Sequence, residues 1–121
     1  MNLKTSYDQK IVRTLKDMKT KYKDKEKARQ ILKTKNPIIY TVYSKKLKNR
    51  NTDLTVMNPG TIGKEYYMTK GHRHKSKGKE TYTLKKGKGI LLVQNKTSQV
   101  MTLKKDKPVT INGTSGHRLI N

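Results

Sequence analysis

The chain has 121 residues and no cysteine, and its 30 Lys and Arg against 8 Asp and Glu give a formal net charge of +22. The lack of cysteine excludes a disulfide framework, a thiolate metal site and a cysteine nucleophile. The length suits one small domain, and because no apolar run is long enough for a transmembrane helix or a signal peptide, we expect a cytoplasmic protein without a membrane partner.

The high positive charge has two interpretations. A strongly basic chain can bind nucleic acid or another polyanion. Here, however, the basic residues are mostly lysines spread along the whole chain, and arginine, which supplies bidentate forks for phosphates and bases, is scarce. No zinc-finger, helix-turn-helix or RNA-binding motif is present. We therefore expect a solvated lysine-rich surface with no specific nucleic-acid partner, and nonspecific binding to polyanions at low salt.

Residues 1–36 are predicted to form an N-terminal arm that contains a short helix. Over residues 1–20 the apolar positions have some helical spacing among many lysines, so a strand and a helix are both open there. Asp24 suits the N-cap of a helix over residues 25–33, whose apolar residues form one stripe. Pro37 and the residue before it end this helix.

Residues 37–121 are predicted to form one all-β domain. Short segments rich in β-branched and aromatic residues alternate with turns that contain Pro, Gly and Asn. Many short, regularly punctuated strands indicate a sandwich or barrel of the jelly-roll type. The expected strands cover residues 38–43, 54–57, 65–74, 80–84, 89–94, 99–103 and 108–111.

The histidines indicate a metal site. His72 and His74 are two residues apart, and His117 lies near the end of the chain. Positions i and i+2 of a strand point to the same face, so the first two can reach one metal ion together. Glu80 follows across a short loop, and His117 could return on a neighbouring C-terminal strand. Three imidazoles and one carboxylate suit one divalent metal ion, iron(II) first, with manganese, nickel or zinc as alternatives.

Each of these residues also has an ordinary structural interpretation. His72 and His74 could be exposed residues of a basic hairpin. Glu80 could pair with one of the many lysines, and His117 could lie in a frayed terminus. The position of Glu80 after the histidine pair favours its role as a metal ligand. For Glu65 two roles stay open, an ion pair with a nearby lysine and a part in the site.

The segment around the histidine pair resembles one protein family, and the resemblance extends over nearly the whole chain. The motifs that carry it are Gly63-x-Glu65, Thr69-x-Gly71-His72-x-His74, Glu80-x-Tyr82 and His117-x-x-x-Asn121. In this order they resemble the cupin-type glucose-6-phosphate isomerases of archaea and some bacteria. The resemblance implies a cupin jelly-roll barrel, a metal held by the three histidines and Glu80, and a cytoplasmic homodimer that interconverts glucose 6-phosphate and fructose 6-phosphate.

The resemblance also implies roles in substrate binding and catalysis. Thr55, Thr69 and Gly71 match residues near the sugar phosphate, where hydroxyl groups and a closely approached backbone N–H suit the anion. Glu80 and Tyr82 match residues near the reacting carbons. Isomerisation moves hydrogen between C1 and C2, by an enediol route that needs a base or by a hydride route that needs a Lewis acid. The sequence leaves open which route applies, and whether Glu80 is a base or only a ligand.

The chain also departs from the pattern of this family. The segment between His74 and Glu80 is one residue shorter, and Asn112 with the following glycine stands where the family has a proline pair. The chain stops at Asn121, where family members continue with strands that carry a further Tyr and His near the substrate. We therefore expect a chain truncated at its C-terminal end relative to the family. The alternative function is a non-catalytic cupin that binds a metal or a sugar phosphate.

Overall fold

The computed structural model describes residues 2–71, 78–112 and 115–121. The chain divides into two compact units, Met1–Tyr67 and Met68–Asn121, each with its own strands and buried residues. The boundary that the sequence predicts after the N-terminal arm stays a prediction. Of the helices in the described ranges, none is long and apolar enough to cross a lipid bilayer.

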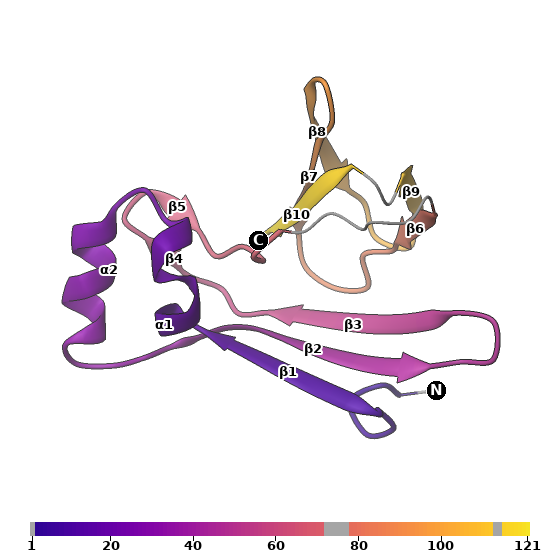
Figure 1. The fold of residues 1–121 in the computed structure, drawn as a ribbon, viewed down its shortest axis with the longest axis horizontal. Helices are drawn as coiled ribbons and strands as arrows, with labels where there is room; N and C mark the ends of the chain where they lie inside the picture. The colour runs from indigo at the N-terminus through magenta and orange to yellow at the C-terminus, as the bar shows by residue number, and fades with distance from the viewer. Residues whose placement is uncertain (1, 72–77, 113–114) are drawn as a thin grey trace. The chain divides into compact units, whose positions relative to one another are not determined.

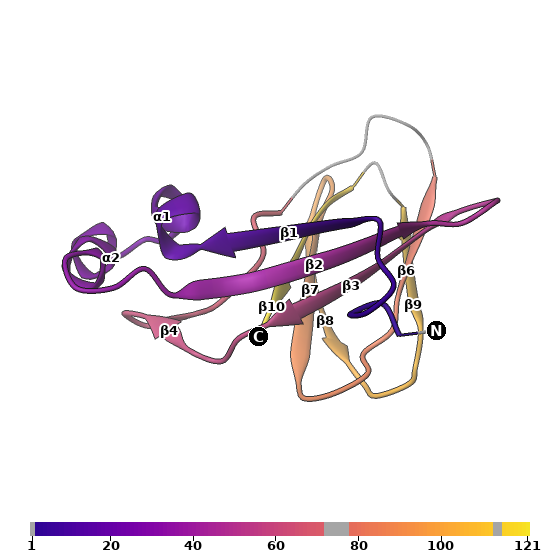
Figure 2. The same ribbon diagram turned by 90° about the horizontal axis from the view of Figure 1, so that it is seen from below.

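The first unit contains a three-stranded antiparallel sheet, in which β2 lies between β1 and β3 (Figures 1 and 2). β-Branched and aromatic residues are frequent in β2 and favour the pleated conformation. The strands predicted over residues 38–43 and 54–57 are confirmed, and both are longer than predicted. The strands are β1 (Gln9–Thr14), β2 (Ile38–Lys46) and β3 (Asn51–Met57).

Two short helices connect β1 to β2, so the open segment at the N-terminus contains both a strand and a helix. At the start of the first helix, the Asp17 carboxylate accepts a hydrogen bond from the backbone N–H of Thr14. The predicted N-cap is confirmed, because the Asp24 carboxylate accepts a hydrogen bond from the backbone N–H of Lys27 at 2.9 Å. The helical segments are α1 (Leu15–Met18), the 3₁₀ turn η1 (Lys19–Lys21) and α2 (Lys25–Leu32).

The first unit ends in a short hairpin of β4 (Thr61–Ile62) and β5 (Glu65–Tyr66). Gly63 in its turn has φ +60°, and a Cβ there would lie 2.8 Å from Oδ2 of Asp24. The Glu65 carboxylate accepts a hydrogen bond from the backbone N–H of Lys23. The Gly63-x-Glu65 motif therefore joins the hairpin to the start of α2, which gives Glu65 a structural contact.

The second unit has two antiparallel sheets. One has the order β10-β7-β8, and the other pairs β6 with β9. These strands confirm, with shifted ends, the predictions over residues 80–111 and the C-terminal strand predicted to carry His117. They are β6 (Lys79–Tyr82), β7 (Gly89–Gln94), β8 (Ser98–Leu103), β9 (Val109–Asn112) and β10 (Gly116–Ile120).

The core of the second unit lies between these two sheets. Leu91 and Val93 of β7 and Leu103 of β8 form one buried cluster with Ile111 of β9. Tyr82 of β6 packs against the same cluster. Full burial of one such aliphatic side chain contributes about 1.5–3 kcal/mol. The two sheets therefore pack face to face, and residues on their inner faces can meet.

The strand predicted over residues 65–74 is wrong over most of its described length. β5 ends at Tyr66, and the chain beyond it makes one isolated bridge, between Met68 and Ile120. The Leu119 N–H donates to the hydroxyl oxygen of Thr69 at 2.9 Å, not to a backbone carbonyl. The Thr69 hydroxyl thus takes the place of the backbone carbonyl that a regular β-ladder would use, and the strand is interrupted there.

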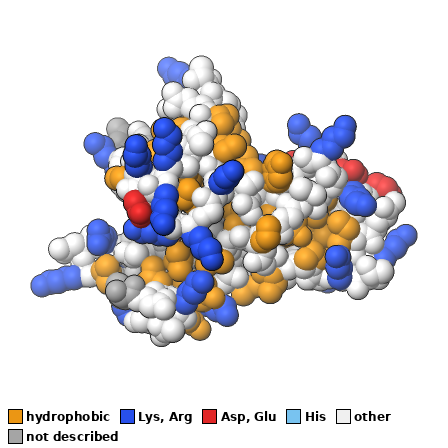
Figure 3. Space-filling view, turned by 180° about the vertical axis from the view of Figure 1, so that it is seen from behind, with side chains coloured by type: hydrophobic (Ala, Val, Ile, Leu, Met, Phe, Trp, Pro, Cys, Tyr) orange, Lys and Arg blue, Asp and Glu red, His pale blue; other side chains and the backbone are white. Residues whose placement is uncertain are grey.

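The prediction of an all-β fold with a helical N-terminal arm is confirmed. Strands dominate both units and the two α-helices lie near the N-terminus, as in a cupin-like fold. The ladders among the described residues form four sheets, and none of these ladders closes into a barrel. On the face shown in Figure 3, Lys and Arg side chains are spread over the surface with few acidic side chains between them.

Candidate functional site

The side chains of Glu80 and His117 meet in the second unit. Glu80 lies on β6 opposite Ile111, and His117 lies on β10 opposite Val93. Because both neighbours belong to the core, the two strands direct Glu80 and His117 toward the space between the sheets. The His117 Nε2 atom is 2.8 Å from Oε2 of Glu80, and the His117 side chain is only 2% exposed.

The surroundings of His117 fix which ring nitrogen carries hydrogen. Nδ1 is 3.0 Å from the carbonyl oxygen of Ser115, and because a carbonyl can only accept, Nδ1 must donate. In the neutral imidazole Nε2 then has a lone pair that faces the carboxylate of Glu80. Two such acceptors at 2.8 Å require a positive charge or a shared proton between them. A proton or a metal ion fits this position, and the donor set is one that divalent transition metals accept.

Tyr82 completes this group of side chains. It lies two residues after Glu80 on β6, so both side chains point to the same face of the strand. The Tyr82 hydroxyl donates to Oε2 of Glu80 at 3.4 Å. Its ring meets the imidazole of His117 nearly edge-on, with centroids 5.9 Å apart. Tyr82 therefore orients the carboxylate and covers one side of the imidazole.

Thr69 and Gly71 lie beside β10 in the same unit. The Thr69 N–H donates to the Leu119 carbonyl at 2.9 Å, and the Thr69 hydroxyl oxygen accepts from the Leu119 N–H. Gly71 has φ +80°, and a Cβ there would lie 3.2 Å from Nε of Arg118 and 3.3 Å from the carbonyl oxygen of His117. Both residues therefore have structural contacts with the strand that carries His117.

The other predicted site residues lie in the first unit or outside the described residues. Thr55 lies on β3 in the first unit, half-buried and opposite Val42. His72 and His74 fall outside the described residues, so the four-ligand metal site stays a prediction. Within the described ranges, no three His, Asp or Glu side chains lie close enough to hold a metal ion.

Two contacts of the site were missed by reasoning from the sequence. The Ser115 carbonyl orients His117, and Arg118 packs against Gly71. A backbone carbonyl leaves no trace in residue type, so nothing in the sequence could have identified the first contact. The second could have been suspected, because a basic residue directly after a candidate ligand must point to the opposite face of the strand.

The second unit also has a hollow of about 230 Å³, which neither Glu80 nor His117 lines. Val93 and Ile111, the strand neighbours of this pair, both line it. Its remaining lining side chains are uncharged, although the chain as a whole is strongly basic. They are Asn95, Thr97, Gln99, Met101, Thr110, Asn112 and Ser115.

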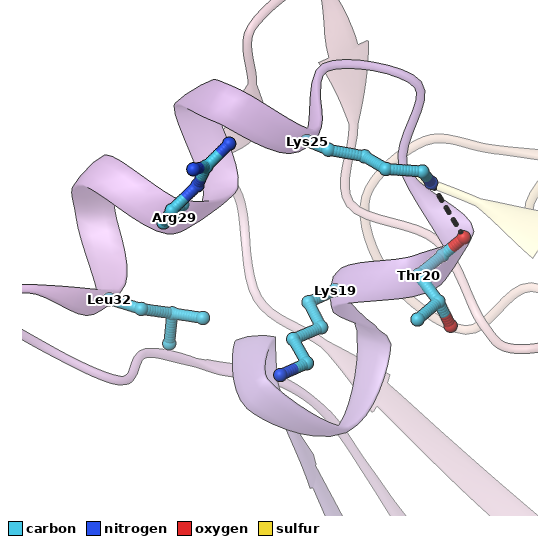
Figure 4. Close-up of a pocket in the computed structure, with 5 residues that line it drawn as sticks. All are labelled: Lys19, Thr20, Lys25, Arg29 and Leu32. Carbon is cyan, nitrogen blue, oxygen red and sulfur yellow. Dashed lines mark hydrogen bonds between the residues drawn. The ribbon is translucent and has the colours of Figure 1, made fainter.

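The first unit has a separate hollow of about 280 Å³ between its helices (Figure 4). Lys19, Lys25 and Arg29 line it together with Thr20 and a leucine. The Lys25 ammonium already donates to the Thr20 carbonyl at 3.1 Å, and Arg29 forms an ion pair within α2. Two of the three cations are therefore engaged, which makes the hollow a weak candidate for an anion site.

Comparisons with known proteins identify the family of this chain. A family model described as glucose-6-phosphate isomerase matches residues 12–121. The chain is 41% identical over 90 residues to a glucose-6-phosphate isomerase of Pyrococcus abyssi, covering 70% of this chain and 48% of the relative. The corresponding protein of Thermococcus gammatolerans is also 41% identical over 90 residues, covering 70% and 47%.

A more distant relative is a putative glucose-6-phosphate isomerase 2 of Rhizobium meliloti, which is 28% identical over 100 residues and covers 78% of this chain and 50% of the relative. The chain spans about half the length of the curated relatives it matches. Because the family model matches nearly the whole chain, this protein belongs to the glucose-6-phosphate isomerase family.

Proposed function

We propose that this chain is a metal-dependent isomerase that interconverts glucose 6-phosphate and fructose 6-phosphate in the cytoplasm. The observation that supports it is the contact of the buried His117 with the partly exposed Glu80, because two acceptors 2.8 Å apart call for a cation or a proton between them. Membership of the family supports the sugar-phosphate substrate.

The metal would be one divalent ion, iron(II) first, with manganese, nickel or zinc as alternatives. Bound there, it would act as a Lewis acid toward the oxygens of the sugar. Its ligands would be His72, His74, Glu80 and His117. The Ser115 carbonyl supports this assignment for His117, because it accepts the hydrogen of Nδ1 and so turns Nε2 toward the carboxylate of Glu80.

The side chains of β6 would serve the proton transfer. The Tyr82 hydroxyl donates to Glu80, so the carboxylate can hold or release a proton while its orientation is kept. The candidates for binding the phosphate group stay those that the sequence indicates, Thr55, Thr69 and Gly71. Of these, the Thr69 hydroxyl keeps its own hydrogen for donation, because its contact with Leu119 uses only the oxygen.

A coupled assay tests the proposal. The metal-stripped protein is reconstituted separately with iron(II), manganese, nickel and zinc, and conversion of fructose 6-phosphate is followed through oxidation of the glucose 6-phosphate formed. Turnover that depends on the added metal is expected, and it should be lost in His117→Ala. A folded protein without metal-dependent turnover would contradict the proposal.

The alternative function is a non-catalytic cupin that binds a metal or a sugar phosphate. It can be distinguished from the isomerase with the same reconstituted protein. Calorimetric titration with fructose 6-phosphate would then show binding while the assay shows no turnover. The expected homodimer is a separate proposal, which light scattering of the purified chain tests.

A further inference from the structure

The segment Met68–Gly71 lies along β10 and is held there by two backbone contacts and one side-chain hydrogen bond. Met68 forms a bridge with Ile120, and Thr69 exchanges two hydrogen bonds with Leu119. This segment directly precedes the predicted ligand His72 in the sequence, and β10 carries His117. This pairing therefore holds the chain, as far as Gly71, against the strand that carries His117.

Arg118 adds a side-chain contact over the same segment. Its Nη2 donates to the Lys70 carbonyl at 3.0 Å, and its Nη1 lies 3.6 Å from the Met68 sulfur. The Nε atom is buried beside Gly71, without a hydrogen-bond partner among the described residues. The guanidinium thus contacts three of the four residues that precede His72.

The role of this arginine differs from that of a surface ion pair. Among the residues that the structure describes, no carboxylate lies within ion-pair distance of Arg118. A partly buried cation is costly unless its hydrogen bonds replace water, and its strongest bond here is to a backbone carbonyl. The contact therefore orders backbone and does not neutralise an acid.

Gly71 provides the space that the guanidinium needs. With φ +80°, Gly71 adopts a conformation that side chains disfavour. A Cβ would press on both Arg118 and the backbone of His117. The glycine and the arginine are therefore a matched pair, each of which allows the other its position.

We propose that Arg118 is a positioning residue that holds Met68–Gly71 on β10 and thereby sets the affinity of the metal site. The effect on metal affinity rests on the function proposed above. The ordering of the segment does not, since it follows from contacts among described residues alone. Arg118 touches neither the metal nor the substrate in this role.

The experiment compares Arg118→Met, which keeps the apolar stem and removes the N–H donors, with Arg118→Lys, which keeps one charged donor. Arg50→Met, at an exposed arginine of the first unit, is the matched control. In the metal-free proteins, amide exchange at Thr69 and Leu119 should be about tenfold faster or more in Arg118→Met. It should be intermediate in Arg118→Lys and unchanged in Arg50→Met, with Leu91 of the core as internal reference.

Cobalt(II) titration then measures the metal site through its visible absorption. Arg118→Met should weaken cobalt binding about 10–100-fold and alter the absorption bands, the size of effect typical of residues that orient ligands. Arg118→Lys should recover part of both. If Arg118→Met does not fold, the same comparison is made between Arg118→Lys and the wild type.

Unchanged exchange at Thr69 and Leu119 would overturn the proposal. So would faster exchange with unchanged cobalt affinity and spectrum, because Arg118 would then only stabilise the fold. Failure of the wild type to bind cobalt would instead contradict the proposed function. In that case the proposed effect of Arg118 on metal affinity would also be contradicted. The exchange rates would still decide whether Arg118 orders the segment Met68–Gly71.

Discussion

His117 has an oxygen atom opposite each of its ring nitrogens, on one side the Ser115 carbonyl and on the other the Glu80 carboxylate. The first can only accept a hydrogen bond, and the second accepts when it is ionised. The imidazole is therefore held in one orientation whatever lies between Nε2 and the carboxylate. This fixed orientation would suit the role proposed for His117, because the ring would need little rearrangement to bind a metal after folding.

Replacing Glu80 by Gln should separate metal binding from folding. The Gln amide can donate to Nε2 of His117, so the fold should persist, but the anionic oxygen is lost. We expect cobalt affinity to fall by about a hundredfold or more, measured by titration, with little change in the melting temperature. Asp106→Asn is the control, because Asp106 is an exposed acid of the same unit, paired with Lys85 at 3.4 Å. Equal cobalt affinity of Glu80→Gln and wild type would exclude Glu80 as a ligand.

Gly71 and Gly87 offer a matched test of steric crowding, because their φ values are +80° and +81°. A Cβ at Gly87 would meet nothing within 4 Å, whereas one at Gly71 would press on Arg118. Gly87→Ala should cost about 1–2 kcal/mol of unfolding free energy for the left-handed conformation alone. Gly71→Ala should cost more, by about 1 kcal/mol or more, as measured by denaturant titration. Equal costs would show that Arg118 moves aside without strain.

At the scale of elements, the sequence predicts best where burial imposes a pattern. The helix after Asp24 and the strand Gly89–Gln94 are both confirmed. An N-cap residue determines where the helix begins, and a run of β-branched and aliphatic residues favours the strand, so both signals can be read from neighbouring residues. The strand predicted over 65–74 is wrong beyond Tyr66. Its apolar and aromatic residues have strand propensity, but Thr69 uses its hydroxyl as the acceptor, and no propensity anticipates that choice.

The N-cap of α2 has two structural consequences that one substitution can test. Asp24 accepts from the Lys27 N–H, and its carboxylate also lies against the turn glycine Gly63. Asp24→Ala should lower the unfolding free energy by about 0.5–2 kcal/mol, measured in urea. Asp24→Asn, which keeps an accepting oxygen, should restore most of it. A loss of the same size in both variants would show that charge matters more than the hydrogen bond.

The site could be predicted only in part. Spacing and resemblance pointed to Glu80, Tyr82 and His117, and the structure brings these three side chains together. Their roles as ligands and catalysts stay predictions. The contact that orients His117 comes from the Ser115 carbonyl, a backbone atom that any residue type supplies.

For the whole molecule, the charge of +22 is its most unusual property. The lysines are spread along the sequence, and the face in Figure 3 has no large acidic patch. We therefore expect salt-sensitive, sequence-independent binding to DNA. Gel shifts should show complexes at low salt that disappear near physiological ionic strength. Complexes that persist there, or that prefer one sequence, would indicate a specific polyanion partner.

Glu80 and His117 belong to different sheets, and their strands are far apart in the chain. An unfolded chain would have to close a long loop to bring the two side chains together, and that closure is entropically costly. Neither sheet can assemble the pair alone. At the metal site proposed above, a rapidly binding metal added during refolding would therefore report the moment at which the two sheets dock. Its lag behind strand formation would give the time that docking requires.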